Sequence, residues 1–283
     1  MINKMRPNRD SARKLFKLSS KVLNKKLDMP MARNSKYSAT SIIRSLIFMS
    51  VTNTSAETGS RYLSRLADVP SPDTVLRRLK ELGLNHAVSS LNEANILLAK
   101  KYLKDGIKMT IDYTEEPYYG KIDMYVTRGK YKSGTDRFHT FATISVVGKD
   151  EGVRLTLYAL PVTRLDDKKE VVRKLLANSP KPSLLLMDRG FFTGDVIKLL
   201  EELNINFIIP AVKNEKVKRT IKQHLEGGPA VIDYNMGTNF YLVIAQRRNC
   251  DKPEDKYMAF ATNLRFDSPE QMIDAVPEEY KYR

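Results

Sequence analysis

Two aspartates, Asp112 and Asp188, have the residue type and the setting for metal chemistry. Each ends a short apolar segment, at 107–112 and 183–188, and Arg189-Gly190 follows the second one directly. Open sheets present ligands and reactive groups at the carboxyl ends of their strands. Carboxylates suit Mg²⁺ or Mn²⁺, and two such ions can activate a hydroxyl nucleophile and stabilise the leaving oxygen of a phosphodiester. We predict that both aspartates bind metal, with two ions expected and a third carboxylate normally completing the site. For either aspartate alone, capping a turn is the alternative.

The charge balance points to a polyanionic partner. The 283-residue chain has 48 Lys and Arg against 33 Asp and Glu, a formal net charge of +15. Cations that neutralise phosphates release counterions whatever the base sequence, which favours nucleic acid over a membrane. The alternative is a protein that is merely basic.

Other bulk features exclude several classes. Cys250 is the only cysteine, so internal disulfides and cysteine metal cages are excluded and a reducing cytoplasm is expected. Residues 1–26 lack the apolar region of a signal peptide, and the apolar run at 41–51 is too short to span a bilayer.

The first part of the chain is expected to be helical. Residues 1–36 are basic and are expected to form a loose arm or a helix that lies on phosphates; a solvated tail is the alternative. Helical periodicity follows over 39–105. One helix is predicted at 56–67 with Tyr62, Leu63 and Leu66 buried. After Asp68-Val69-Pro70, another is predicted with Ser71 as N-cap and Pro72 in its first turn.

That second helix is expected to bury Val75, Leu76, Leu79 and Leu82 and to end at Gly83. Its outer face would carry Arg77, Arg78 and Lys80. A helix, a short break and a basic helix outline a helix-turn-helix that enters a major groove. Any helical hairpin with a basic outer face gives the same pattern, and that alternative stays open.

The pattern changes near residue 105, where we place a domain boundary between 1–105 and 106–283. Strands are predicted at 107–112, 139–147, 153–162, 183–188 and 206–210, with helices at 166–177 and after Thr193. This order predicts an α/β fold: a ribonuclease H-like mixed sheet with a β-rich insertion, preceded by an all-helical N-terminal domain.

Two segments interrupt that plan. Residues 113–138 are expected to be a long loop in which basic residues alternate with tyrosines, a composition suited to phosphate contacts and base stacking, or to a solvated lid. Residues 212–262 are expected to form a basic helix and a small inserted sheet with strands at 230–235, 240–247 and 257–262.

Other catalytic constellations lack support. His86, His139 and His224 show no ligand spacing and are interpreted as structural. No phosphate-binding glycine loop and no serine nucleophile motif occurs.

Four segments resemble the DDE transposases of the IS-four-like insertion-sequence superfamily, especially its archaeal members. They are Thr110-Ile-Asp112-Tyr, Lys132-Ser-Gly-Thr-Asp-Arg-Phe-His139, Met187-Asp-Arg-Gly-Phe-Phe192 and Phe260-Ala-Thr-Asn-Leu264. The resemblance covers about 105–283. It implies that Asp112 and Asp188 are metal ligands of the catalytic site, and that a β-rich insert follows the fifth strand.

The family's third ligand is a glutamate in a Y-x2-R-x3-E-x6-K signature. Tyr280-Lys-Tyr-Arg283 matches the first part, which implies that Tyr280 and Arg283 contact DNA phosphates. The glutamate would fall four residues after Arg283, so a chain truncated before its last catalytic helix is expected. Glu278 and Glu279 precede the tyrosine and do not match.

The resulting hypothesis is a transposase that uses Mg²⁺ or Mn²⁺ to cleave and transfer the strands of an insertion sequence. Its partners would be double-stranded DNA, at terminal inverted repeats and at the target, and a second copy on paired ends. No membrane partner is expected, and the protein would act in the cytoplasm at the nucleoid. The predicted DNA contacts are Arg77, Arg78, Lys80, Arg128, Lys130, Lys132, Arg189, Lys213, Tyr280 and Arg283. Two alternatives remain: an inactive remnant that binds DNA or regulates transposition, and a ribonuclease H-like DNA nuclease.

Overall fold

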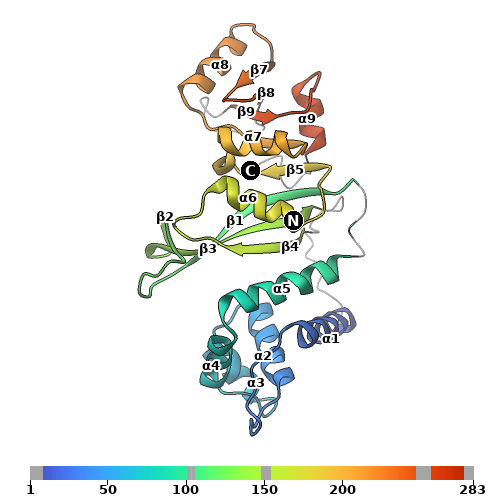
Figure 1. The fold of residues 1–283 in the computed structure, drawn as a ribbon, viewed down its shortest axis with the longest axis vertical. Coiled ribbons are helices and arrows are strands. Elements are labelled where there is room, and N and C mark those ends of the chain that lie inside the picture. The colour runs from blue at the N-terminus through green and yellow to red at the C-terminus, as the bar shows by residue number, and fades with distance from the viewer. Residues whose placement is uncertain (1–8, 101–102, 104–105, 148–153, 247–255, 277–283) are drawn as a thin grey trace. The chain divides into compact units, whose positions relative to one another are not determined.

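The computed structural model describes residues 9–100, 103, 106–147, 154–246 and 256–276. The chain divides into two compact units, Met1–Lys100 and Lys101–Arg283, each described here by itself. In the described residues, no helix has the length and apolar character needed to cross a bilayer. Figure 1 shows the elements of both units.

The described part of the first unit is built from helices. Their N-termini follow from capping: Ser38, Ser55 and Ser71 each accept a hydrogen bond from the backbone N–H three residues later. Ile42, Ile43, Val75 and other apolar side chains form their shared core. The helices are α1 (Arg9–Lys26), α2 (Ala39–Thr52), α3 (Ala56–Ser64), α4 (Pro72–Leu82) and α5 (Leu84–Ala99).

Two expectations about buried faces in this unit are wrong. Tyr62 and Leu66 are 55% and 83% exposed, and Leu66 lies beyond the end of α3 at Ser64. In α4, Leu76 is 53% exposed whereas Arg78 is only 7% exposed. The inward face of α4 is Val75, Arg78 and Leu82, spaced three and four residues apart, so Leu76 lies on the outer side.

In its described residues, the second unit is a mixed α/β structure around one nine-stranded sheet. Strand order is β2-β3-β1-β5-β6-β9-β8-β7, and β4 also pairs with β3. β1 is parallel to β5 and β5 to β6, whereas the other pairs are antiparallel. The strands are β1 (Lys108–Pro117), β2 (Val126–Lys132), β3 (Thr135–Val147), β4 (Arg154–Pro161), β5 (Leu184–Met187), β6 (Phe207–Pro210), β7 (Val231–Asn235), β8 (Asn239–Gln246) and β9 (Tyr257–Thr262).

Helices pack onto this sheet. In Figure 1, α6 and α7 cross in front of it, and α6 contacts β3 and β4. Met272 of α9 and the following Val276 join Leu184, Leu186 and Ile208 in an apolar cluster. The helices are α6 (Lys168–Ala177), the short 3₁₀ helix η2 (Arg189–Phe191), α7 (Gly194–Glu202), α8 (Glu215–Leu225) and α9 (Pro269–Ala275).

The expected loop at 113–138 is wrong over much of its length. β1 continues to Pro117, and β2 and β3 form a hairpin closed by Ser133 and Gly134, with φ of +52° and +79°. Two positive-φ residues make the tight turn whose twist matches paired strands. Because β2 carries Arg128, Lys130 and Lys132 at alternate positions, its period of two is polar and does not show as an apolar pattern.

The small inserted sheet expected at 212–262 is continuous with the main sheet. Its three strands are present, but β9 pairs antiparallel with β6, from Ile208↔Thr262 to Pro210↔Phe260. The segment therefore extends the main sheet, because the edge of β6 offers unpaired backbone groups to a neighbouring strand.

Candidate active site

Asp112 lies within β1 and not at its end, which corrects the sequence expectation. Towards β3 the ladder continues past it, with Asp112 opposite Thr143. Towards β5 the parallel ladder ends one residue earlier, at Ile111↔Met187. Asp112 therefore stands at the carboxyl end of the parallel β1–β5 pair, where β1 still pairs with β3 but no longer with β5.

Asp188 follows β5 directly and begins a turn. Its Oδ1 accepts a hydrogen bond from the backbone N–H of Arg189 at 2.6 Å, and its carbonyl accepts one from Phe191 at 3.0 Å. These bonds make Asp188 the N-cap of η2. Asp112 Oδ1 likewise accepts from the backbone N–H of Tyr113, at 2.9 Å. Both carboxylates are thus oriented by the main chain of the following residue.

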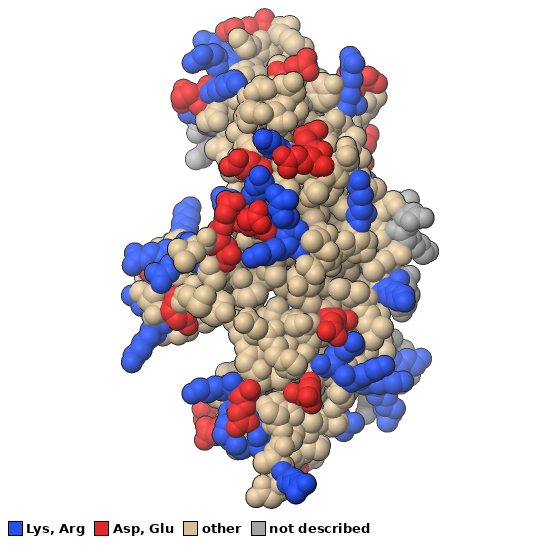
Figure 2. All heavy atoms as spheres, in the orientation of Figure 1, with Lys and Arg blue, Asp and Glu red and all other residues tan. Residues whose placement is uncertain are grey.

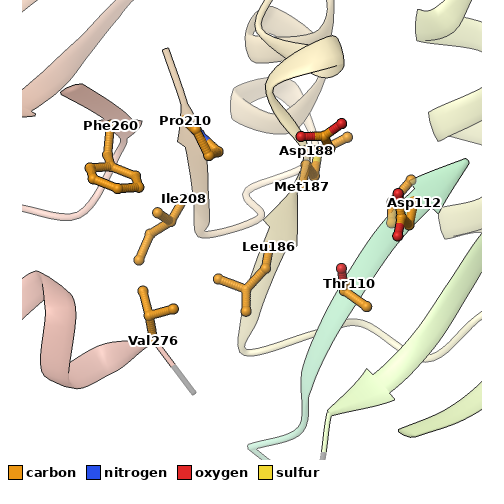
Figure 3. Close-up of a pocket in the computed structure, with 10 residues that line it drawn as sticks. Thr110, Asp112, Leu186, Met187, Asp188, Ile208, Pro210, Phe260 and Val276 are labelled. Carbon is orange, nitrogen blue, oxygen red and sulfur yellow. The ribbon is translucent and has the colours of Figure 1, made fainter. Parts of the chain in front are cut away.

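The two aspartates belong to the same face of the sheet. Thr110 is opposite Leu186, and Leu186 is opposite Ile208. Because side chains alternate between faces, the residues two positions later, Asp112 and Asp188, share the face of Thr110 and Leu186. Both line one pocket of about 250 Å³. In Figure 3 the two carboxylates lie beyond Thr110 and Leu186 along their strands.

The rest of this pocket is apolar. Leu186, Ile208, Phe260 and Val276 line it on the side away from the carboxylates, as Figure 3 shows. An apolar wall excludes water, which strengthens the electrostatic interactions of nearby charges. The arrangement provides hard oxygen donors at the rim of a dry wall, a setting that suits a divalent cation.

An aromatic pair lies behind the aspartates. Tyr113 follows Asp112, and Phe191 lies in the turn after Asp188. Their rings stack with centroids 4.8 Å apart and an angle of 16° between planes. Burial, and then the carboxylates of Asp166 and Asp167, raise the pKa of Tyr113 to about 12. Phe191 is fully buried. Because its ring contacts that of Tyr113, the pair connects the segment that carries Asp112 to the segment that carries Asp188.

The predicted DNA contacts fall into separate groups. Arg77, Arg78 and Lys80 lie on α4 of the first unit. For Arg78 only the expected outer-face position is wrong: its guanidinium is buried, with Nη1 donating to Glu81 and Nη2 to Ser35. An arginine held inside the unit in this way is not on the outer face where the sequence placed it.

Arg128, Lys130 and Lys132 lie on the β2–β3 hairpin, where Figure 2 shows a concentration of Lys and Arg side chains. Two of them already have acidic neighbours. Arg128 Nη1 is 3.6 Å from Asp136, and Lys132 Nζ is 2.9 Å from Glu115.

Arg189 is exposed directly beside Asp188, whereas half-buried Lys213 precedes α8. The ammonium of Lys168 donates to the carbonyl of Gly190 at 2.8 Å and adds a cation near Arg189. The sequence did not single out Lys168, Tyr113 or Phe191, because each acquires its place from a distant segment. Tyr280 and Arg283 lie outside the described residues.

The donor set fits a divalent ion in part. Two carboxylates share the pocket, and Mg²⁺ accepts a site with few protein ligands. Across the described ranges, no cluster of three or more His, Cys, Asp or Glu could hold a metal.

Comparison with known proteins identifies the domain around this pocket. Residues 110–271, more than half of the chain, match the family model described as "Transposase DDE domain". This range contains both aspartates and both rings of the stack. A search of curated proteins gave no match.

Two solved structures are similar at low levels. The chain is 12% identical to a piggyBac transposase synaptic complex with hairpin DNA, with a TM-score of 0.48 and coverage of 95% of this chain and 61% of the other. It is 14% identical to the Drosophila P element transposase strand transfer complex, with a TM-score of 0.32 and coverage of 81% and 52%. The chain thus matches little more than half the length of each.

Proposed function

The chain belongs to the family with a transposase DDE domain, and from this premise we propose that it cleaves and transfers DNA strands of an insertion sequence in a metal-dependent reaction. The observation that carries the proposal is the shared pocket of Asp112 and Asp188. Within the family, we propose the IS-four-like, archaeal-type subgroup on the four sequence segments alone.

We also propose a ribonuclease H-like catalytic core. Leaving out the β2 hairpin, neighbouring strands run β4-β3-β1-β5-β6, with three antiparallel strands first and parallel strands added through α6 and α7. This order supports the expected mixed sheet. The role of the first unit as a domain that recognises element ends is a separate proposal, supported by its basic surface residues such as Arg77 and Lys80.

Asp112 and Asp188 would hold Mg²⁺ or Mn²⁺, two ions in the full site. Bound there, the metal would lower the pKa of a water or hydroxyl nucleophile and stabilise the leaving oxygen of the phosphodiester. The chain's own contribution is positional. Backbone N–H groups orient each carboxylate, and the Tyr113–Phe191 stack links the two segments.

Cations around the pocket would hold the DNA. Because Arg189 is exposed beside Asp188, we propose that it would bind a phosphate next to the cleaved bond. The hairpin cations would bind phosphates further along the duplex. Lys213, Tyr280 and Arg283 are kept as proposed contacts from the sequence. A second copy of the chain on paired ends is proposed from the resemblance.

The test is cleavage of DNA carrying the element ends, with Mg²⁺ or Mn²⁺. We expect Asp112→Ala and Asp188→Ala each to lower the cleavage rate roughly a thousandfold, because each removes a ligand that supports several kcal/mol of charge stabilisation. Asp233→Ala is the matched control, since Asp233 is an exposed carboxylate on β7 outside the pocket. Unchanged cleavage in either pocket variant would refute the assignment.

The products separate the alternatives. Joined DNA supports transposition, whereas free ends alone support a nuclease. Tight binding of terminal repeats by the unmodified chain, without any metal-dependent product, supports a DNA-binding protein that represses or regulates an active transposase.

A further inference from the structure

A second pocket lies within the first unit, between residues 31–37 and α4. Its volume is about 400 Å³. It shares no lining residue with the aspartate pocket. Its walls contain Met31, Ala32, Asn34, Ser35, Lys36, Tyr37, Thr74, Arg77 and Arg78.

The pocket is cationic. Lys36, Arg77 and Arg78 line it, and its lining, which lies wholly in the described residues, contains no carboxylate. Two acids pair with these cations: Asp68 with Lys36 at 3.1 Å, and Glu81 with both arginines at 3.3 and 2.6 Å. Three cations against these two carboxylates leave one positive charge uncompensated. A phosphodiester group carries one negative charge and would balance it.

Arg78 distinguishes this pocket from a group of exposed cations, because its side chain is buried. Its side chain is more than nine-tenths buried and is fixed by Glu81 on one side and by Ser35, at 3.0 Å, on the other. Its Nε–H is buried without a hydrogen-bond partner among the described residues. Its guanidinium therefore contributes a fixed positive charge to the wall of the pocket.

The remaining walls supply hydroxyl groups and a fixed lysine. Ser35, Tyr37 and Thr74 bring side-chain hydroxyls to the pocket, and Thr74 lies in the first turn of α4, where the helix dipole favours an anion. Lys36 is held by Asp68, which also accepts a bond from the Tyr37 hydroxyl at 2.8 Å. An ammonium and two guanidiniums match the oxygens of a phosphate.

We propose that this pocket binds a backbone phosphate of DNA. The inference rests on the proposed function, since it takes DNA to be the partner of the first unit, and it assigns that unit a specific phosphate site. Lys36 and Arg77 supply the exposed charges, and Arg78 forms the fixed inner wall. The contact carries no base information, so it would set the position of the unit on the duplex and leave sequence reading to other side chains.

The first experiment uses inorganic phosphate as the probe and the full chain without DNA. Arginine Nε–H signals are followed by NMR, and affinity is measured by calorimetry. We expect the Arg78 signal to shift as phosphate binds, and Lys36→Gln or Arg77→Gln to weaken phosphate about tenfold, through loss of a charged hydrogen bond.

Two matched controls remove the same charge outside the pocket. Arg33→Gln changes the same segment as Lys36, and Lys80→Gln changes the same helix as Arg77; neither residue lines the pocket. Both should bind phosphate like the unmodified chain. No Arg78 shift at tens of millimolar phosphate, or equal weakening in all four variants, would overturn the proposal.

The second experiment measures DNA affinity against salt concentration. Losing one phosphate contact should reduce the slope of log affinity against log salt by about 0.9 in Lys36→Gln, as expected for duplex DNA. If the unmodified chain binds DNA but Lys36→Gln and Arg77→Gln keep its slope, the pocket assignment fails and the proposed function stands. If the unmodified chain does not bind DNA, both the proposed function and the assignment of this pocket to DNA fail.

Discussion

The two pockets contain charged side chains of opposite sign, and these side chains are oriented by different kinds of contact. At β1 and β5, Asp112 and Asp188 stand at the rim of an apolar wall, each oriented by the backbone N–H of the next residue. Beside α4, Arg78 is inside the wall and is oriented by the side chains of Ser35 and Glu81. Each acid thus accepts a hydrogen bond from the main chain of the next residue, whereas the arginine is part of the packing. It follows that removing an acid should change chemistry, and removing Arg78 should change stability.

The largest contrast in stability is expected between Arg78 and its neighbour. Arg78→Met should lower the free energy of unfolding of the first unit by about 2 kcal/mol, because Ser35 and Glu81 lose their donor. Arg77→Met removes an exposed ion pair from the same helix and should change it by about 0.5 kcal/mol or less. Urea unfolding followed by circular dichroism gives both values.

At the aspartate pocket, Asp188→Asn is expected to change activity and to leave stability nearly unchanged. Asparagine also caps helices, so unfolding should change by about 0.5 kcal/mol or less while metal-dependent cleavage is lost. A large loss of stability in Asp188→Asn, or none in Arg78→Met, would remove the distinction between the two pockets.

A smaller effect is expected at the aromatic stack. Tyr113→Leu should cost about 1 kcal/mol of stability, the usual value of a stacked pair, and should slow cleavage roughly tenfold by loosening the spacing of the aspartates. Tyr113→Phe keeps the ring and should retain the activity. A shift in the Mn²⁺ concentration for half-maximal cleavage in Tyr113→Leu alone identifies Tyr113 as a positioning residue. Equal activity in both variants would leave the stack with a purely structural role.

The smallest effect concerns alkaline pH. Burial raises the pKa of Tyr113 to about 12, above its ordinary value of 10.0. The folded state therefore keeps the proton longer than the unfolded state, so stability is unaffected below pH 10 and declines between about pH 10 and 12. Tyr113→Phe should show a shallower decline over this range in urea unfolding. Identical pH profiles would mean that the hydroxyl is solvated.

The sequence identified the strands of the second unit better than the faces of the first. The apolar runs at 183–188 and 206–210 correspond to β5 and β6. Strands that are buried on both faces consist mainly of apolar residues, so they are visible in the sequence as continuous apolar runs. Ser71 and Thr193 cap helices as expected, since capping is local chemistry. The buried face of α4 could not be predicted, because the burial of Arg78 depends on its hydrogen bond to Ser35, which lies far away in the chain.

Other misses have equally specific causes. The β2–β3 hairpin was obscured because its alternating residues are cations, and α9 was missed although Ser268, Pro269 and Glu270 carry the usual signals of a helix start. Pairing of β9 with β6 is long-range and leaves no local pattern. In the candidate site, the two aspartates could be named from the sequence, whereas Lys168 and the Tyr113–Phe191 contact required the fold.

The pairing of β9 with β6 also bears on how the sheet avoids aggregation. Without β9, the backbone groups of Ile208 to Pro210 would form an open, apolar edge able to recruit strands from other molecules. The segment 212–262 moves that exposed edge outward to β7, a strand of five residues whose Asp233 is charged and exposed. Short, charged edge strands pair poorly with foreign strands. The segment thus covers the edge of β6, and we expect its deletion to produce a protein that aggregates.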